Sequence, residues 1–230
     1  MEQSNQIRVI TAVERQKRSR VRYNIFLAGE FAFSIHEDLL IKHKLLKGEM
    51  VEGKRLAELL LEDEKHRAYV DAIRFISIRA RATKEVRQKL TTRGYEPPLI
   101  DQTLVDLERQ GYLDDRSFAE LWASERMRLQ KKGRKWVELE LKQKGSKQPW
   151  IEAAMGKVAE EEERRYALEL AEKRWRQLNG DLLVRKRKLY DFLLRRGFSS
   201  ALTAEAIQRV SGGVAEEEWE LDISGEYEET

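Results

Sequence analysis

The sequence contains no cysteine, and only three prolines and three histidines occur among its 230 residues. Without cysteine the chain can form neither a disulfide framework nor a thiolate zinc site, which fits a reducing compartment such as the cytoplasm. No apolar run approaches the length of about 18 residues that a membrane-spanning helix needs. The first residues also lack the apolar core of a signal peptide. We therefore expect a cytoplasmic protein without a membrane partner.

Catalytic motifs are equally scarce. His36, His43 and His66 have no paired spacing, and the sequence has no glycine-rich phosphate loop and no HExxH pattern. The sequence thus predicts no enzyme, no cofactor and no metal ion. Two adjacent carboxylates, Asp114 and Asp115 in "GYLDDRSFAELW", invite a catalytic or metal-binding interpretation.

Charge, in contrast, is abundant. Charged residues make up 37% of the chain and hydrophobic residues 41%, with a net charge of +3, whereas an average domain is about 25% charged. Nine Lys or Arg stand against two Glu from Arg126 to Lys147, and eight acids but no base follow Arg209. A basic middle with an acidic tail favours an anionic partner such as nucleic acid, although any one basic run alone is typical of a solvated helix face.

The start of the chain has the pattern of a small sheet. "IRVITAVE", "VRYNIFLA" and "EFAFSI" are short, partly alternating and rich in β-branched and aromatic residues. The "AGE" between the last two predicts a hairpin turn, and a helix is expected from about Glu52 to Leu61. Residues 1–65 are therefore predicted to form a β-rich N-terminal domain with one helix.

The remaining chain repeats itself. A basic residue and a glycine close each unit's second helix, and the glycines, Gly94, Gly145 and Gly197, are 51 and 52 residues apart. Apolar residues then recur at i, i+3, i+4 and i+7, as on one face of a helix. The pattern predicts a mainly α protein with three tandem three-helix repeats, which stack into an elongated array. Their expected bounds are 66–113, 114–159 and 160–211, followed by an acidic tail, 212–230.

This organisation explains the two aspartates. Acids precede the first helix of every repeat, where carboxylates cap free N–H groups and offset the helix dipole. Adjacent helical residues point roughly 100° apart and converge poorly on one ion. We predict that Asp114 and Asp115 cap a helix and that Phe118, Leu121 and Trp122 anchor its core. Arg126 is expected to pair with a carboxylate rather than with a ligand.

The segment "GYLDDRSFAELWASERMRLQKKGRKWVELELKQKGSKQPWIEAAM" resembles the central signature of the RecX family, regulators of the RecA recombinase. The β-rich start resembles the N-terminal extension of longer members. Ser146 departs from the pattern, which usually has an apolar residue there, and the acidic tail lies outside it. The matching residues are Gly111, Leu113, Asp114, Asp115, Phe118, Ala119, Arg126, Gly133, Leu141, Lys144 and Gly145.

The resemblance implies a regulator that is not an enzyme and lies in the helical groove of the RecA–DNA filament. Such a protein restrains RecA's ATP hydrolysis, strand exchange and coprotease activity in DNA repair and the SOS response. We expect a monomer that binds single- and double-stranded DNA weakly and electrostatically. One alternative is a helix-turn-helix-like DNA-binding protein acting without RecA, although the third helices offer few side chains that read bases. Another is a scaffold that binds only protein.

Basic residues gather around the second helix of each repeat, and this recurrence favours a binding surface for RecA or DNA. The connection Lys131–Lys135 is expected to be exposed, with charges that repel one another until an anionic partner neutralises them. Gly133 is expected to let it conform to that partner. The predicted surface comprises Arg79, Arg81, Lys84, Arg87, Lys89, Arg128, Lys131, Lys132, Arg134, Lys135, Lys142, Arg185, Lys186, Arg187 and Lys188.

Overall fold

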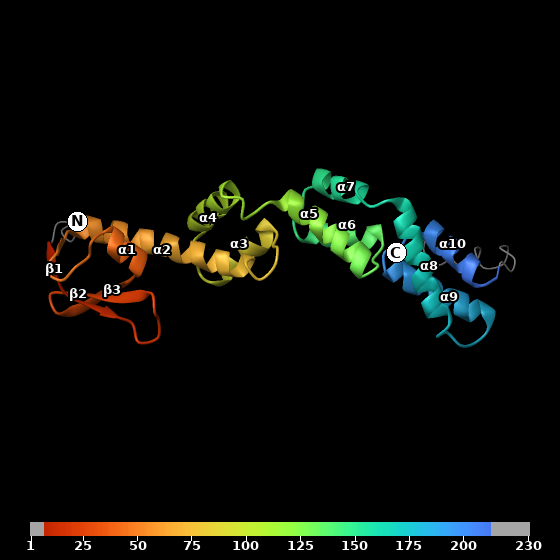
Figure 1. The fold of residues 1–230 in the computed structure, drawn as a ribbon, viewed down its shortest axis with the longest axis horizontal. Coiled ribbons are helices and arrows are strands. Elements are labelled where there is room, and N and C mark those ends of the chain that lie inside the picture. The colour runs from red at the N-terminus through yellow and green to blue at the C-terminus, as the bar shows by residue number, and fades with distance from the viewer. Residues whose placement is uncertain (1–6, 213–230) are drawn as a thin grey trace, which may run out of the picture. The chain divides into compact units, whose positions relative to one another are not determined.

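The computed structural model describes residues 7–212 (Figure 1). Its contacts define two compact units, one of residues up to 80 together with 86–113, the other of residues 81–85 together with 114 onward. The acidic tail, apart from its first residue, lies outside the described residues. From residue 7 to residue 212, no helix combines the length and apolar character needed to cross a membrane.

The first unit begins with a four-stranded antiparallel sheet of order β3-β2-β1-β4. Side chains along β2 and β3 point alternately to the two faces of the sheet, so Ile25, Phe33 and Ile35 share one face and are buried in one core. The predicted hairpin is confirmed, because Ala28 and Gly29 take positive φ angles of 51° and 89° between two paired strands. The strands are β1 (Arg8–Arg15), β2 (Arg22–Leu27), β3 (Glu30–His36) and β4 (Met50–Val51).

A short helix, α1 (Glu37–Lys42), and a long one, α2 (Gly53–Ile76), follow. The expected end of the second near Leu61 is wrong, because α2 continues without interruption for 24 residues. No glycine or proline breaks it after its first residue, and its buried side chains serve two cores. Leu59 packs in the core of the sheet, and Ala72 packs in the core of the first helical repeat.

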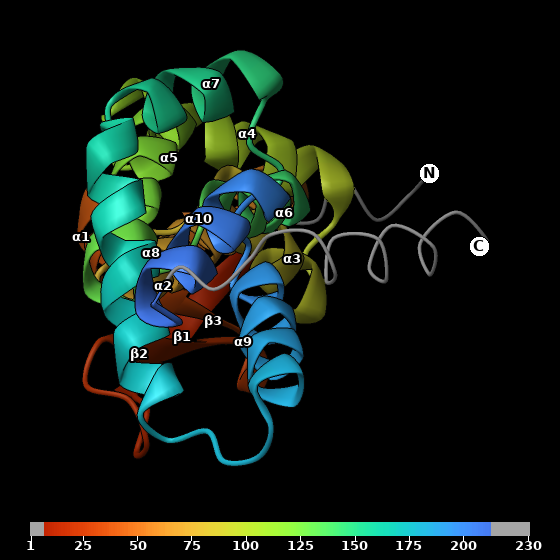
Figure 2. The same cartoon turned by 90° about the vertical axis from the view of Figure 1, so that its right-hand side faces the viewer.

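Three-helix repeats make up the rest, as predicted. The end of α2 with α3 (Thr83–Thr92) and α4 (Pro97–Arg109) forms the first. The second has α5 (Asp115–Ser124), a π-helical segment (Glu125–Leu129), α6 (Arg134–Gln143) and α7 (Gln148–Gly156). The third has α8 (Glu160–Trp175), α9 (Leu182–Arg195) and α10 (Ser200–Val210), in which α10 packs against α8 and α9 (Figure 2).

The predicted helix ends and apolar stripes are confirmed. Gly94, Gly145 and Gly197 follow their second helices with φ angles of 85°, 89° and 90°, a conformation that glycine adopts without strain. The stripe that starts at Ile151 is buried in the core of the second repeat, and Ile207 is buried in that of the third. A mainly α fold of three helical repeats after a small sheet is thus observed.

Candidate partner-binding surface

Asp114 is the N-cap of α5, as predicted. Its Oδ1 accepts hydrogen bonds from the backbone N–H groups of Arg116 and Ser117, both at 3.0 Å. Its Oδ2 accepts one from the Ser117 hydroxyl at 2.7 Å. The hydroxyl contributes most to lowering the pKa of Asp114, and the backbone N–H groups add to it. The carboxylate is therefore committed to starting a helix.

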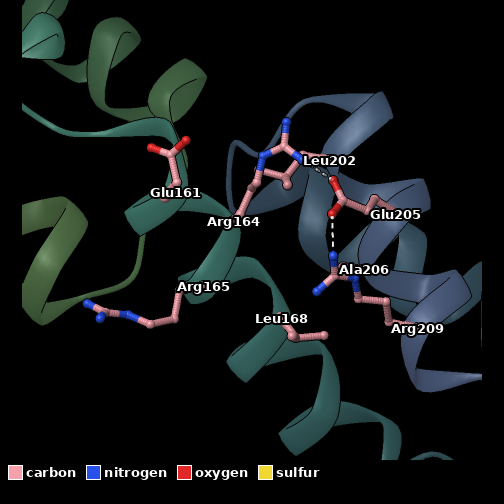
Figure 3. A pocket seen from close by; sticks show the side chains of 8 residues that line it. All are labelled: Glu161, Arg164, Arg165, Leu168, Leu202, Glu205, Ala206 and Arg209. Carbon is pink, nitrogen blue, oxygen red and sulfur yellow. Dashed lines mark hydrogen bonds and ion pairs between the residues drawn. The ribbon is translucent and has the colours of Figure 1, made fainter.

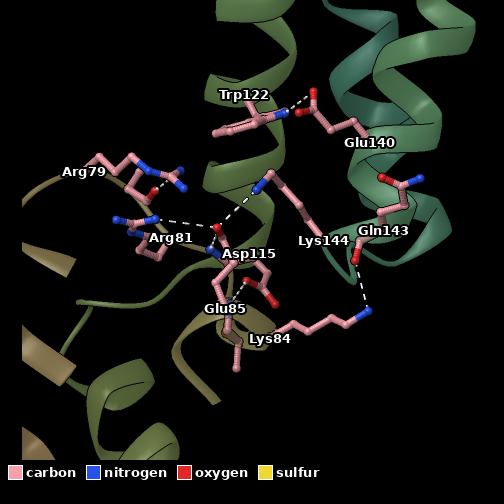
Figure 4. Close-up of polar contacts among 12 residues, drawn as sticks. Arg79, Arg81, Lys84, Glu85, Asp115, Trp122, Glu140, Gln143 and Lys144 are labelled. Atoms are coloured by element: carbon pink, nitrogen blue, oxygen red, sulfur yellow. Dashed lines mark hydrogen bonds and ion pairs between the residues drawn. The ribbon is translucent and has the colours of Figure 1, made fainter. Parts of the chain in front are cut away.

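Asp115 makes a contact that the sequence did not predict. Its Oδ1 accepts a 2.7 Å hydrogen bond from the backbone N–H of Thr83, the first residue of α3, in the region drawn in Figure 4. Asp115 lies in the first turn of α5, as predicted. The expectation that its carboxylate also caps this helix is wrong, because it caps the helix of the preceding repeat. The two residues are 32 positions apart, so no local pattern marks the pair.

The next junction uses the same arrangement. Glu163, in the first turn of α8, is buried, and its Oε1 accepts a 2.8 Å bond from the backbone N–H of Arg134, the first residue of α6. Its Oε2 pairs with Nε of the same arginine at 2.9 Å. The arginine also donates to the carbonyl oxygens of Met155 and Val158. Each acid thus ties a repeat's first helix to the second helix of the repeat before it.

The second helices of the last two repeats also meet end to end. The N–H of Gly133 donates to the carbonyl oxygen of Arg196 at 2.9 Å, and the N–H of Lys135 to that of Gly197 at 3.1 Å. The free carbonyls that end α9 therefore satisfy the free N–H groups that start α6, with the helix dipoles head to tail.

Gly133 has a role different from the one expected. A Cβ on Gly133 would lie 2.3 Å from the backbone C and O of Gly197, and the φ of Gly133 is an ordinary −74°. The glycine is needed because two backbones approach closely, and it does not make the connection adaptable. The expectation of a conforming loop is therefore wrong.

Arg126 is a structural residue, as predicted. Its guanidinium stacks 3.9 Å from the Trp122 ring centroid, and its Nε donates to Glu140 Oε2 at 3.2 Å. The indole N–H of Trp122 donates to the same oxygen at 2.9 Å. Lys144 also contacts this tryptophan: its Nζ lies 4.2 Å from the centroid of the Trp122 ring and 3.2 Å from Glu85 Oε1 (Figure 4). Phe118 and Leu141 are buried beside it, whereas Leu121 is exposed, so the expectation that Leu121 anchors the core is wrong.

The residues of the predicted binding surface that lie in the first unit are only partly exposed to a partner. Arg79 and Arg87 are exposed, and Arg87 pairs with Asp101. Lys89 is half-buried, with its ammonium 5.7 Å from the Phe75 ring. These side chains belong to the first repeat's second helix and the turn before it.

The connection Lys131–Lys135 departs most from expectation. Lys131 pairs with Glu169, and Arg134 pairs with Glu163. Lys132 lies 3.9 Å from the Trp136 ring, and burial, then the charge of Arg196, lowers its pKa. The prediction of an exposed loop of unneutralised charges is wrong here, because acids of α8 and an aromatic ring already engage three of its cations.

The predicted cations of the third repeat also fall into two groups, those engaged within the protein and those exposed to solvent. Lys186 is buried, and Arg185 stacks 3.9 Å from the Trp175 ring. Arg187 and Lys188 are exposed. Arg128 of the second repeat is exposed but pairs with Glu162, and Arg81 pairs with Glu85. Cations that are exposed and without an ion pair in the described part of the second unit include Lys84, Lys135, Lys142 and Lys188.

Equivalent positions connect these exposed cations. Lys84, Lys135 and Arg187 each stand 10 residues before the glycine that ends their helix. All three belong to the second unit, and Lys84 donates to the carbonyl oxygen of Gln143 at 3.0 Å. The repeat therefore places a cation at one equivalent position of every second helix, in the first turn of α3 and α6 and further along α9.

A shallow groove of about 300 Å³ runs between α8 and α10 (Figure 3). Glu205 lies in it between Arg164, at 2.9 Å, and Arg209, at 3.2 Å. Its lining has no histidine and no hydroxyl or thiol side chain. It is lined by Glu161, Arg164, Arg165, Leu168, Leu202, Glu205, Ala206 and Arg209.

Four family models match the chain in order. The regulatory protein RecX N-terminal domain matches residues 8–52. The first, second and third RecX three-helix domains match residues 68–107, 114–155 and 160–207.

Whole proteins agree with these domains. Regulatory protein RecX of Halalkalibacterium halodurans is 35% identical over 218 residues, which cover 92% of this chain and 82% of the relative. That of Listeria monocytogenes serovar 1/2a is 30% identical over 220 residues, covering 95% and 79%. A crystal structure of regulatory protein RecX matches with a TM-score of 0.68 at 28% identity, over 88% of this chain and 99% of that one. The four domains in order, with relatives that match over most of their own length, show that this chain belongs to the RecX family of regulatory proteins.

Proposed function

We propose that this protein binds the RecA–DNA filament in its helical groove and lowers RecA's ATP hydrolysis, strand exchange and coprotease activity. The observation that carries the proposal is the match of all four RecX domains, in order, across residues 8–207. The protein acts as a cytoplasmic monomer and as a regulator, with no chemistry of its own. Its domains end near residues 65, 113, 159 and 211.

The exposed cations support a surface that meets phosphates or acidic protein at intervals. Lys84, Lys135 and Arg187 recur at one position of the repeat. The backbone hydrogen bonds between Gly133 and Arg196 and between Lys135 and Gly197 hold α6 and α9 in fixed register. A partner whose acidic groups are regularly spaced can contact such cations at several points. Binding to single- or double-stranded DNA alone stays weak, because few phosphates are neutralised.

A RecA ATPase assay on single-stranded DNA tests the proposal. Titrating the folded protein should lower the rate of ATP hydrolysis, and the protein should be retained on filaments that are captured through biotinylated DNA. Bare DNA at the same salt concentration is the control, and it should retain much less protein. Equal retention without RecA would favour the helix-turn-helix-like alternative, and an unchanged ATPase with no retention on filaments would refute the proposal.

A further inference from the structure

Two histidines that are far apart in sequence meet in the N-terminal domain. His36 ends β3 and caps α1, Asp38 lies in the first turn of α1, and His66 lies on α2. The imidazole rings of His36 and His66 have centroids 4.3 Å apart. The sequence offered no metal-ligand spacing for them, because α2 brings His66 back to β3 from 30 residues away.

Their ligand atoms have nearly the separations that a metal ion requires. His36 Nδ1 and His66 Nε2 lie 3.3 and 3.9 Å from Asp38 Oδ2, and all three atoms lie within 4.8 Å of one another. Tetrahedral zinc with bonds of about 2.0–2.1 Å places its ligand atoms about 3.3 Å apart. The His36–Asp38 pair already fits, and the Asp38 side chain is exposed enough to move closer to His66. A rotation of the imidazole rings would have to shorten the remaining distance, and His36 Nδ1 would exchange the hydrogen bond that it accepts from the Asp38 N–H for the ion.

His66 adds an independent observation. Its Nε2 is buried and has no hydrogen-bond partner in the described part of the chain, although buried polar atoms in proteins nearly always have one. Burial, then the nearby His36, lowers the pKa of His66, because both disfavour a positive charge on the ring.

We propose that His36, Asp38 and His66 bind one divalent transition-metal ion of the Zn²⁺ class, with the remaining position filled by water. Two imidazoles and one carboxylate form a donor set that suits such ions. The ion would join the start of α1 to the middle of α2. The affinity for the ion is limited, because the nearby Asp63 adds no free negative charge to the site. Its carboxylate already pairs with Arg22 at 2.8 Å and with Arg67 at 3.2 Å.

Calorimetric titration of Zn²⁺ into the untagged, EDTA-stripped full chain tests the site. We expect one ion per chain, and a rise in the thermal midpoint that depends on Zn²⁺ concentration. His36→Gln and His66→Gln should each weaken binding at least tenfold. His43→Gln is the matched control, because His43 pairs with Glu62 at 2.7 Å, outside the cluster, and it should bind like the wild type.

Ring-nitrogen NMR of the wild type keeps the test independent of variant folding. Zn²⁺ should shift the signals of His36 and His66 and leave those of His43 in place. The proposal is wrong if the wild type binds no more tightly than His66→Gln, if His43→Gln loses as much affinity, or if the ring signals of His36 and His66 do not move.

Discussion

The two junctions between successive repeats are built alike but differ in how closely they fit. Where α6 meets the first turn of α3, a side chain fills the gap, and a Cβ on Gly145 would lie 3.0 Å from Lys84 Cδ. Where α9 meets α6, backbone touches backbone, and a Cβ on Gly197 would lie 2.3 Å from Trp136 Cβ and 2.4 Å from its N. A lysine side chain can move aside, whereas a backbone held by two hydrogen bonds cannot. The contact at Gly145 can therefore adjust to an added methyl group, whereas the contact at Gly197 cannot.

The largest effect that tests this comparison comes from the glycines. Gly145 and Gly197 have nearly identical φ angles of 89° and 90°, so alanine pays the same backbone strain of about 1–3 kcal/mol at either site. Gly197→Ala must also displace the backbone of Trp136, and we expect it to lower the free energy of unfolding by about 2 kcal/mol or more beyond Gly145→Ala. Urea denaturation measures both, and equal losses would mean that the two junctions fit equally closely.

The acids that cross the junctions give the second effect. Glu163 is buried and accepts two hydrogen bonds from Arg134, so Glu163→Gln should lower stability by about 2–3 kcal/mol. Asp115 is half-buried and accepts one from Thr83 N–H, so Asp115→Asn should lower it by about 1 kcal/mol. Chemical denaturation measures both losses. If Asp115→Asn lowered the free energy of unfolding more than Glu163→Gln, the contact at Asp115 would depend more strongly on its carboxylate than the contact at Glu163 does.

These junctions also separate what the sequence could predict from what it could not. Helix ends and stripes depend on residues within a turn or two, so Gly145, Ile151 and the Asp114 cap could be predicted from spacing. Asp115 has the same local signature as Asp114, and only the fold brings it to Thr83, 32 residues earlier.

Long-range packing also limited the prediction of the site. A run such as "QKKGRK" is typical of a solvated surface, and nothing near it in the sequence signals that Glu163 and Glu169 lie opposite Arg134 and Lys131. The family and the repeats could therefore be predicted, but the division of the cations into engaged and exposed ones required the structure.

A smaller effect distinguishes capping from catalysis at Asp114. Asp114→Ala should lower stability by about 0.5–2 kcal/mol, as cap losses do, while the folded variant still inhibits RecA. Asp181→Ala is the matched control, because Asp181 is the N-cap residue of α9 without a side-chain cap hydrogen bond, and it should cost less. Lost activity with unchanged stability would make Asp114 a site residue.

The pH dependence of the same variant follows from the lowered pKa. Hydrogen bonds from Ser117 and Arg116 hold the pKa of Asp114 below its unfolded value, which is about 3.9. Its contribution to stability is therefore full above about pH 4 and is lost as the pH falls through the folded pKa. The stability gap between wild type and Asp114→Ala should be constant from about pH 5 to 7 and should narrow below about pH 4. A gap that persisted in acid would contradict the role of the ionised carboxylate.

The smallest effect on stability is expected where the cations are exposed. Lys135, Lys142 and Lys188 make no ion pair with other described residues, so replacing all three with serine should change stability by less than about 0.5 kcal/mol per site. Replacing Lys131 and Arg134 instead would confound binding with folding, because both pair with acids of α8. The exposed triple variant is thus the clean test of the binding surface.

If each of the three lysines meets a phosphate of single-stranded DNA, log K should depend less steeply on log salt by about 2, since each contact contributes roughly 0.7. The matched control removes the same charge from the N-terminal domain, at the exposed Lys17, Lys54 and Lys65. A surface that binds the filament predicts a flatter slope and weaker filament retention for the first variant only. Equal changes of slope and retention in both variants would mean that binding depends on the protein's net charge and not on where the lysines lie. No change in either would assign filament binding to other faces, since a lysine that meets a phosphate cannot be removed without releasing fewer counterions on binding.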